Sequence, residues 1–257
     1  AAAAGQWEEV LLFLNAEPFG VADPIFGRDV AFYIFTLPVY RFVQGWVLTL
    51  LFIALVGLLP IYAATNLADI QRGRWRPFGS PALRSHAALL GGVLLLVWAT
   101  GYIFDTYDLL YSTRGVAYGA SYTDMSAVLW ALRLQLVFVA LTALALFYNA
   151  FRPNLRLPLI TGSLWLISSV VVGGLLPGIL QRYVVEPNEL TLETPYIENN
   201  IAFTRFAYGL DRVETREFGQ VVDLQPEDLL DNEDVLRNIR LWDWRPLQQT
   251  YRQLQGL

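Results

Sequence analysis

Four stretches of this sequence are long, apolar and almost free of charge: Trp46–Ala64, Ala87–Phe104, Ser126–Phe151 and Leu157–Leu180. An α-helix rises about 1.5 Å per residue, so about 20 residues cross the roughly 30 Å of a membrane's hydrocarbon core. Helices of water-soluble proteins keep a polar face, whereas these stretches are apolar on all sides. We therefore expect an α-helical polytopic membrane protein. Its four transmembrane helices are predicted at about 44–65, 85–104, 126–151 and 157–181.

Charge divides the chain near residue 183. Residues 1–182 carry 11 Arg against 9 Asp and Glu, a net charge of +2, whereas residues 183–257 carry 7 against 14, a net of −7. The division separates a transmembrane domain, 44–183, from the start of an acidic, water-facing domain, 184–257. The acidic tail would repel phosphate, so no nucleic acid partner is expected. Membrane lipids are the expected partners, with other membrane-protein subunits as a further possibility.

Arginines in the predicted loops set the orientation. Arg72, Arg74, Arg76 and Arg84 lie between the first two spans, and Arg152 and Arg156 lie between the last two. Loops rich in Arg stay on the cytoplasmic side of a membrane. Residues 1–43 and 184–257 are therefore predicted to be extracytoplasmic.

Residues 1–43 are predicted to form an aromatic region at the membrane interface. Trp7–Asn15 is a candidate helix on the membrane surface, and the segment that follows is dense in Pro, Gly and aromatic residues, which predicts an ordered loop. Between the second and third spans, Thr123 or Asp124 is the predicted N-cap of the third helix, because side-chain oxygens accept from free helical N–H groups.

The tail is predicted to mix helix and strand. Thr194 fits an N-cap, Pro195 the first helical position and Gly209 the position after a helix end. Arg212–Phe218 alternates loosely, as strands do, and Pro226–Leu241 has leucines at helical spacing. Residues 184–257 are therefore expected to be an incomplete extracytoplasmic α+β region.

Catalytic residue types are scarce. The chain has no Cys and no Lys, which excludes thiol chemistry, disulfides, Schiff bases and phosphate-loop lysines. The one histidine, His86, is at the predicted cytoplasmic start of a span, and the acidic group near Asp231 lacks the spacing of a calcium loop. We therefore predict no catalytic residue, no cofactor and no metal site, and the composition favours a protein that is not an enzyme.

Two features inside the spans are candidates for function. Arg133 is the one charge well inside a span, where it can extend to the surface or pair with Asp105 or Asp124. The fourth span is interrupted by glycines and by Pro177, which cannot donate to the carbonyl of Gly173, so a kink is expected. Kinked helices form transport sites where their carbonyls face a cavity, but most such prolines only shape packing.

Four strings carry a resemblance to a known family: Phe13–Pro38, Leu109–Asp124, Gln181–Glu214 and Asn238–Leu247. They resemble uncharacterised protein family 0182, a group of large bacterial membrane proteins. The resemblance implies about seven spans followed by a large extracytoplasmic domain, so this chain looks like an internal fragment in a bacterial plasma membrane. The family has no assigned catalytic residues, so none carry over.

Two functions stay open at this point. The first is a non-catalytic envelope or accessory subunit, which anchors an extracytoplasmic domain and contacts partners. The alternative is a transporter or lipid-handling protein that uses the broken fourth helix. An envelope hydrolase or transferase would need residues outside this chain.

Overall fold

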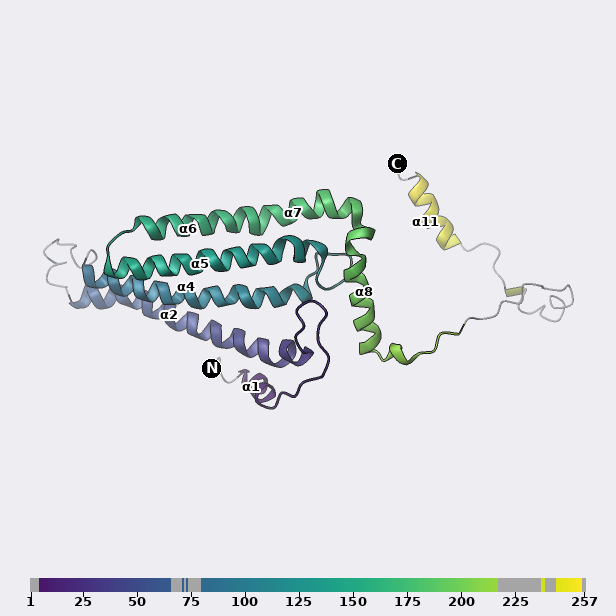
Figure 1. Ribbon diagram of the computed structural model, residues 1–257, viewed down its shortest axis with the longest axis horizontal. Helices are drawn as coiled ribbons and strands as arrows, with labels where there is room; N and C mark the ends of the chain where they lie inside the picture. Colours follow the sequence, from purple (N-terminus) through teal and green to yellow (C-terminus); the bar gives the residue numbers. More distant parts are fainter. Residues whose placement is uncertain are drawn as a thin grey trace. The chain divides into compact units, whose positions relative to one another are not determined.

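The computed structural model describes residues 5–65, 71, 73, 80–216, 237–238 and 244–255. Its contacts divide the chain into two units, Ala1–Leu210 and Asp211–Leu257. The first unit contains the long apolar helices (Figure 1). In the second unit the longest described helix is α11 (Trp244–Gln255).

Four apolar helices of the first unit lie side by side in chain order (Figure 1): α2 (Leu37–Thr65), α4 (Pro81–Asp108), α5 (Leu129–Phe151) and α6 (Arg156–Ser168). α4 packs between α2 and α5, and α5 packs between α4 and α6. The helical segments that contain them are long and apolar enough to cross a membrane. The prediction of four long apolar helices is confirmed. We call this layer the helix row.

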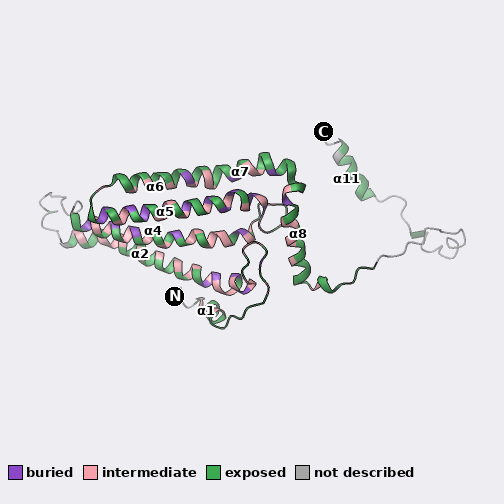
Figure 2. Ribbon diagram, viewed as in Figure 1, coloured by how far each residue is buried: buried purple, intermediate pink, exposed green. Residues whose placement is uncertain are grey.

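Many buried residues of the row are alanines, whereas many of its exposed residues are large and apolar. Figure 2 shows the buried positions spread along the helices. α5 buries four alanines, Ala131, Ala143, Ala145 and Ala150. Lipid tails are as apolar as leucine, so helices in a membrane associate by close packing of small residues rather than by leaving water. α4 and α5 approach closely at Gly92 of α4, where an added Cβ would lie 2.7 Å from the ring of Phe147 in α5.

The fourth span is one helical run that changes its helix type along its length, and the kink predicted at Pro177 stays a prediction. After α6 come a π-helical segment, η6 (Ser169–Leu175), the short α7 (Leu176–Leu180) and a second π-helical segment, η7 (Gln181–Val185). A 3-10 turn, η8 (Glu186–Asn188), leads into α8 (Glu189–Ala207). α8 turns away from the direction of α7 and lies across the end of the row (Figure 1).

Prolines follow three of the four described π-helical segments, and η5 (Asp124–Val128) is the exception. η2 (Phe32–Thr36), η6 and η7 each end two residues before a proline: Pro38, Pro177 and Pro187 respectively. A proline offers no N–H to the preceding turn, and its ring crowds a carbonyl there. The wider π turn accommodates both effects without ending the helix.

The N-terminal region is partly as predicted. The surface helix is present as α1 (Trp7–Leu14). The predicted loop ends earlier than expected, because helix begins at Val30 and continues through η2 into α2. Extending the loop past Pro38 was wrong, since the π turn of η2 lets the helix run through that proline.

The α+β prediction for residues 184–257 is wrong for the described part of the chain. There the tail contains α8, the 3-10 turn η9 (Leu210–Arg212) and α11, with no strand. Arg212 ends a 3-10 turn and residues 213–216 lack regular structure, since a lone alternating segment gains nothing without a neighbouring strand. Residues 217–218, and the predicted helix Pro226–Leu241 except 237–238, lie outside the described residues.

The predicted start of α8 was wrong and its end was right. The helix begins at Glu189, so Pro195 lies inside it rather than at its first position, and the Thr194 hydroxyl donates to the Leu190 carbonyl instead of capping. Gly209 follows the helix with a φ of 64°, the left-handed conformation that glycine adopts without strain.

Candidate functional site

One end of the helix row is covered by the loop after α1, the loop between α4 and α5, and α8 (Figure 1). We call it the capped end. Ser121 directly precedes the helix that begins at Tyr122 and leads into α5. Its hydroxyl accepts from the N–H of Asp124 at 3.2 Å, and the Asp124 carboxylate accepts from the Ser121 N–H at 3.1 Å and from its hydroxyl at 2.7 Å. This reciprocal pair is a capping box. The predicted N-cap was therefore two to three residues late, and Asp124 is the partner of the cap.

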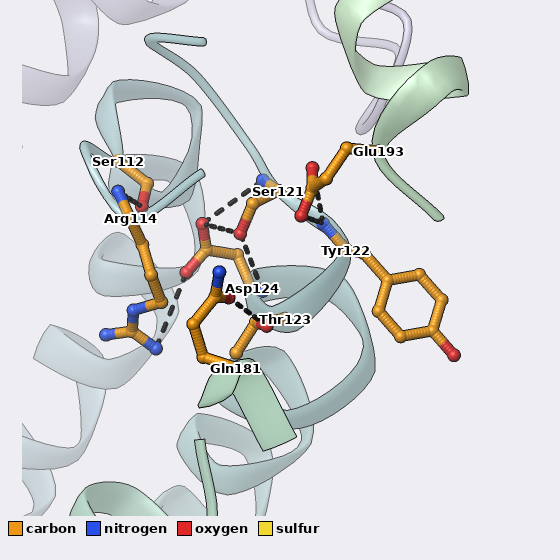
Figure 3. Close-up of polar contacts among 8 residues, drawn as sticks. All are labelled: Ser112, Arg114, Ser121, Tyr122, Thr123, Asp124, Gln181 and Glu193. Carbon is orange, nitrogen blue, oxygen red and sulfur yellow. Dashed lines mark hydrogen bonds and ion pairs between the residues drawn. The ribbon is translucent and has the colours of Figure 1, made fainter. Parts of the chain in front are cut away.

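Asp124 is buried but close to a positive charge. The Arg114 guanidinium lies 3.7 Å from the Asp124 carboxylate (Figure 3). The backbone N–H of Arg114 donates to the Ser112 hydroxyl at 3.2 Å. The side chain of Asp124 is only 1% exposed. The arginine and the capping bonds together stabilise a carboxylate that burial alone would destabilise.

Three hydrogen bonds attach η7 and α8 to the segment before α5 (Figure 3). The Thr123 hydroxyl donates to the Gln181 side chain at 2.5 Å, and the Tyr122 N–H donates to both Glu193 oxygens, at 3.2 and 3.3 Å. Farther along α8, the Asn200 side chain donates to the Tyr118 carbonyl at 2.5 Å. These bonds hold α8 across the capped end.

Asp23 organises the loop after α1. Its carboxylate accepts from the N–H groups of Ile25, Phe26 and Arg28, and from the Tyr33 hydroxyl at 2.6 Å. Burial acts to raise the pKa of Asp23, but these donors stabilise the charged form and hold its pKa below the ordinary value.

Asp29 fixes the same loop from its other side. It accepts from the N–H groups of Phe19, Gly20 and Ala31, at 2.8–3.0 Å. The bond from Ala31 contributes most to lowering the pKa of Asp29 below its ordinary value. A single antiparallel bridge between Ala22 and Asp29 completes the turn.

A cavity of about 280 Å³ lies where these elements meet. Each of three segments contributes six residues to its wall. They are Asp23, Pro24, Ile25, Val30, Tyr33 and Ile34; Leu110, Tyr111, Ala117, Tyr118, Gly119 and Ala120; and Glu193, Tyr196, Ile197, Asn199, Asn200 and Phe203. Its volume is near the lower end of the range for ligand pockets, about 300–1,000 Å³. The wall is mainly apolar and aromatic, with a few polar groups, as in pockets that bind small molecules.

The sequence-predicted positions do not come together. Asp105 pairs with Arg41 of α2 at 3.1 Å, and Arg41 also pairs with Asp108. Arg133 is exposed on α5, where its guanidinium lies 5.0 Å from the centre of the Trp130 ring. Within the described residues, neither Asp105 nor Asp124 forms an ion pair with Arg133.

Gly173 lies beside α5, and neither Gly173 nor Pro177 lines the cavity. A Cβ added to Gly173, in η6, would clash with the side-chain nitrogen of Gln135, which is buried. Pro177 is buried in α7. The missing side chain of Gly173 therefore lets α5 approach the fourth span closely.

Sequence reasoning missed Ser121, Glu193 and Asp23. Ser121-Tyr122-Thr123-Asp124 matches the capping-box pattern, a serine followed three residues later by an acid, so that signal was present in the sequence. Glu193 had no comparable signal, because its partner Tyr122 is 71 residues away. Within the described residues, no group of three His, Asp or Glu side chains is placed to hold a metal ion.

The whole chain, residues 1–257, matches the family model described as Uncharacterised protein family (UPF0182). It is 42% identical over 266 residues to a UPF0182 protein of Moorella thermoacetica, and 40% identical over 252 residues to one of Trichodesmium erythraeum. A UPF0182 protein of Desulforamulus reducens is 38% identical over 254 residues. These alignments cover 98–99% of this chain but only 27–28% of each relative. No solved structure matches the chain.

Proposed function

The chain belongs to the uncharacterised protein family UPF0182, and from that premise we propose that it is a non-catalytic envelope or accessory subunit. In this proposal the helix row anchors the protein in the bacterial plasma membrane. The capped end faces outward and orients an extracytoplasmic domain, of which residues 184–257 are the start. Partners then bind at the outer side.

The attachment of α8 is the observation that carries this proposal. If the helix continued straight from α7, no other helix of the row would contact residues 186–207 and fix their direction. Instead, the segment before α5 forms hydrogen bonds with Gln181, Glu193 and Asn200. These bonds give α8 a defined direction relative to the helix row. An anchor that orients a water-facing domain needs the chain to leave the helix row in a fixed direction, and the attachment of α8 provides one.

A lipid-handling or transport role is the second candidate. The cavity beneath α8 favours it, because an apolar wall with a few polar groups suits a small amphipathic molecule. Transport along the broken fourth helix would in addition need a path beside Gly173, where Gln135 now packs.

Site-specific photo-crosslinking in the complete protein tests the anchor proposal. A photoreactive amino acid at Leu190, which is 84% exposed on α8, should capture one defined protein segment or partner in stoichiometric yield. The matched position is Leu159 of α6, 66% exposed on the helix row, where lipid should be captured instead.

The double variant Gln181→Ala, Asn200→Ala should reduce the protein crosslink from Leu190 several-fold, because α8 loses two of its attachments. Lipid alone captured from both positions would contradict the proposal. So would purified protein without partners that converts a substrate and loses that activity on mutation of the capped end.

A further inference from the structure

We propose that the cavity at the capped end binds an ammonium group carried on an apolar body, with Glu193 as the counter-charge. This assignment goes beyond the anchoring role, since an anchor needs no ligand. It rests on the charge of the cavity wall, on the surroundings of Glu193 and on the aromatic rings beside it.

The wall of the cavity carries acids and no base. Asp23 and Glu193 line it, and none of its described lining residues is Arg or His. A phosphate, sulfate or carboxylate would meet only like charge there. The charge therefore favours a cation, and the apolar remainder of the wall favours a cation attached to a hydrocarbon group.

The two acids differ in how many hydrogen-bond donors their carboxylates contact. Asp23 accepts from three backbone N–H groups and a tyrosine hydroxyl, so it serves the fold of its own loop. Glu193 is 2% exposed, and within the described residues it accepts only from the Tyr122 N–H and forms no ion pair. A carboxylate has about four acceptor positions, so Glu193 has capacity left for a donor in the cavity.

The surroundings of Glu193 suit a buried ammonium. Four tyrosine rings line the same cavity: Tyr33, Tyr111, Tyr118 and Tyr196. Aromatic faces attract cations, and quaternary and alkyl ammonium groups are recognised by such rings together with a carboxylate. Pairing with Glu193 offsets the cost of removing the ammonium from water.

Calorimetric titration of the complete protein with n-octylammonium tests the proposal. Dodecylmaltoside micelles are the medium because they contain no ammonium group, and protein-free micelles correct for partitioning. Glu193→Gln should weaken binding about tenfold or more, since a hydrogen bond to a charged group is lost while the amide oxygen still accepts from Tyr122. Glu198→Gln, an exposed acid on the same helix, should leave binding unchanged.

A second variant keeps the test decisive if Glu193→Gln unfolds. Ala117→Phe fills the cavity without changing its charge, and it should also weaken binding by tenfold or more. Equal binding to the wild type and to the folded variants would overturn the proposal, as would equal affinity for n-octyl sulfate. Displacement of n-octylammonium by sphingosine, a lipid amine without a phosphate, would support it with a lipid as the source, and absence of displacement by sphingosine would support it with a soluble amine.

Discussion

Asp23 accepts four hydrogen bonds and thereby determines the course of a loop that is otherwise rich in glycine and proline. Asp29 does the same from the opposite side with three backbone donors. Their lowered pKa values are the consequence, because every donor favours the charged form. These acids hold the fold of the loop, whereas Glu193 retains acceptor capacity toward the cavity.

Acidification should therefore loosen this loop only at low pH. The folded-state pKa of each acid is below 3.8, its ordinary value, so its stabilising effect is complete above that pH and is lost as pH falls through the folded pKa. In thermal unfolding between pH 8 and pH 3, Asp23→Asn should be less stable than wild type by about 1–3 kcal/mol at neutral pH. The difference should shrink below about pH 4.

Glu17→Gln is the control, because Glu17 is exposed in the same loop. It should unfold like the wild type at every pH. A difference between wild type and Asp23→Asn that stays constant down to pH 3 would show that the charge of Asp23 does not hold the loop.

At the scale of elements, prolines and glycines shape the helices in two ways. A π-helical segment comes shortly before each of Pro38, Pro177 and Pro187. The helical path continues through these prolines, because the wider π turn accommodates them. Glycines allow neighbouring helices to approach. Neither effect ends a helix, which is why the prediction of a loop that includes Pro38 and extends past it was wrong.

The α4–α5 interface gives a matched pair of substitutions. At Gly92 an added Cβ would lie 2.7–3.0 Å from three atoms of the Phe147 ring, whereas at Gly91 the nearest atom is Leu146 Cδ1 at 3.5 Å. Gly92→Ala should destabilise the protein by about 1–3 kcal/mol through overpacking, and Gly91→Ala should be neutral or slightly stabilising.

Thermal unfolding of detergent-solubilised protein measures both changes. Phe147→Leu combined with Gly92→Ala should recover part of the lost stability, because the smaller side chain makes room for the methyl group. Equal effects of the two alanine substitutions would mean that α4 and α5 do not meet at Gly92.

At the scale of the whole molecule, the helix row has two ends of different character. The capped end has buried carboxylates and a cavity, and the opposite end has Arg152 and Arg156 near the connection from α5 to α6. The positive-inside rule places the arginines in the cytoplasm. The orientation of the capped end toward the outside is a prediction from that rule.

Thiol labelling of whole cells tests the orientation. Tyr208 and Leu155 are 80% and 60% exposed, at the capped end and at the opposite end respectively, and this chain has no cysteine of its own. A membrane-impermeant maleimide should label Tyr208→Cys in intact cells and Leu155→Cys only after permeabilisation. The reverse pattern would invert the topology.

Hydrophobicity and capping are local properties, so the sequence by itself determined the four apolar helices, the turn at Gly209 and the family. The capping box at Ser121 was readable too, since both partners lie within four residues. The strand predicted from Arg212 onward could not be tested on local sequence alone, because a strand depends on a neighbouring strand that forms hydrogen bonds with it.

Only the tertiary structure decided which distant side chains meet. Asp105 pairs with Arg41, 64 residues away, and not with Arg133, and Glu193 meets Tyr122 across 71 residues. The cavity is formed by three segments whose sequences carry no shared pattern. Contacts of this kind depend on how helices pack and where α8 turns, and close packing is a property of the assembled row rather than of any one stretch of sequence.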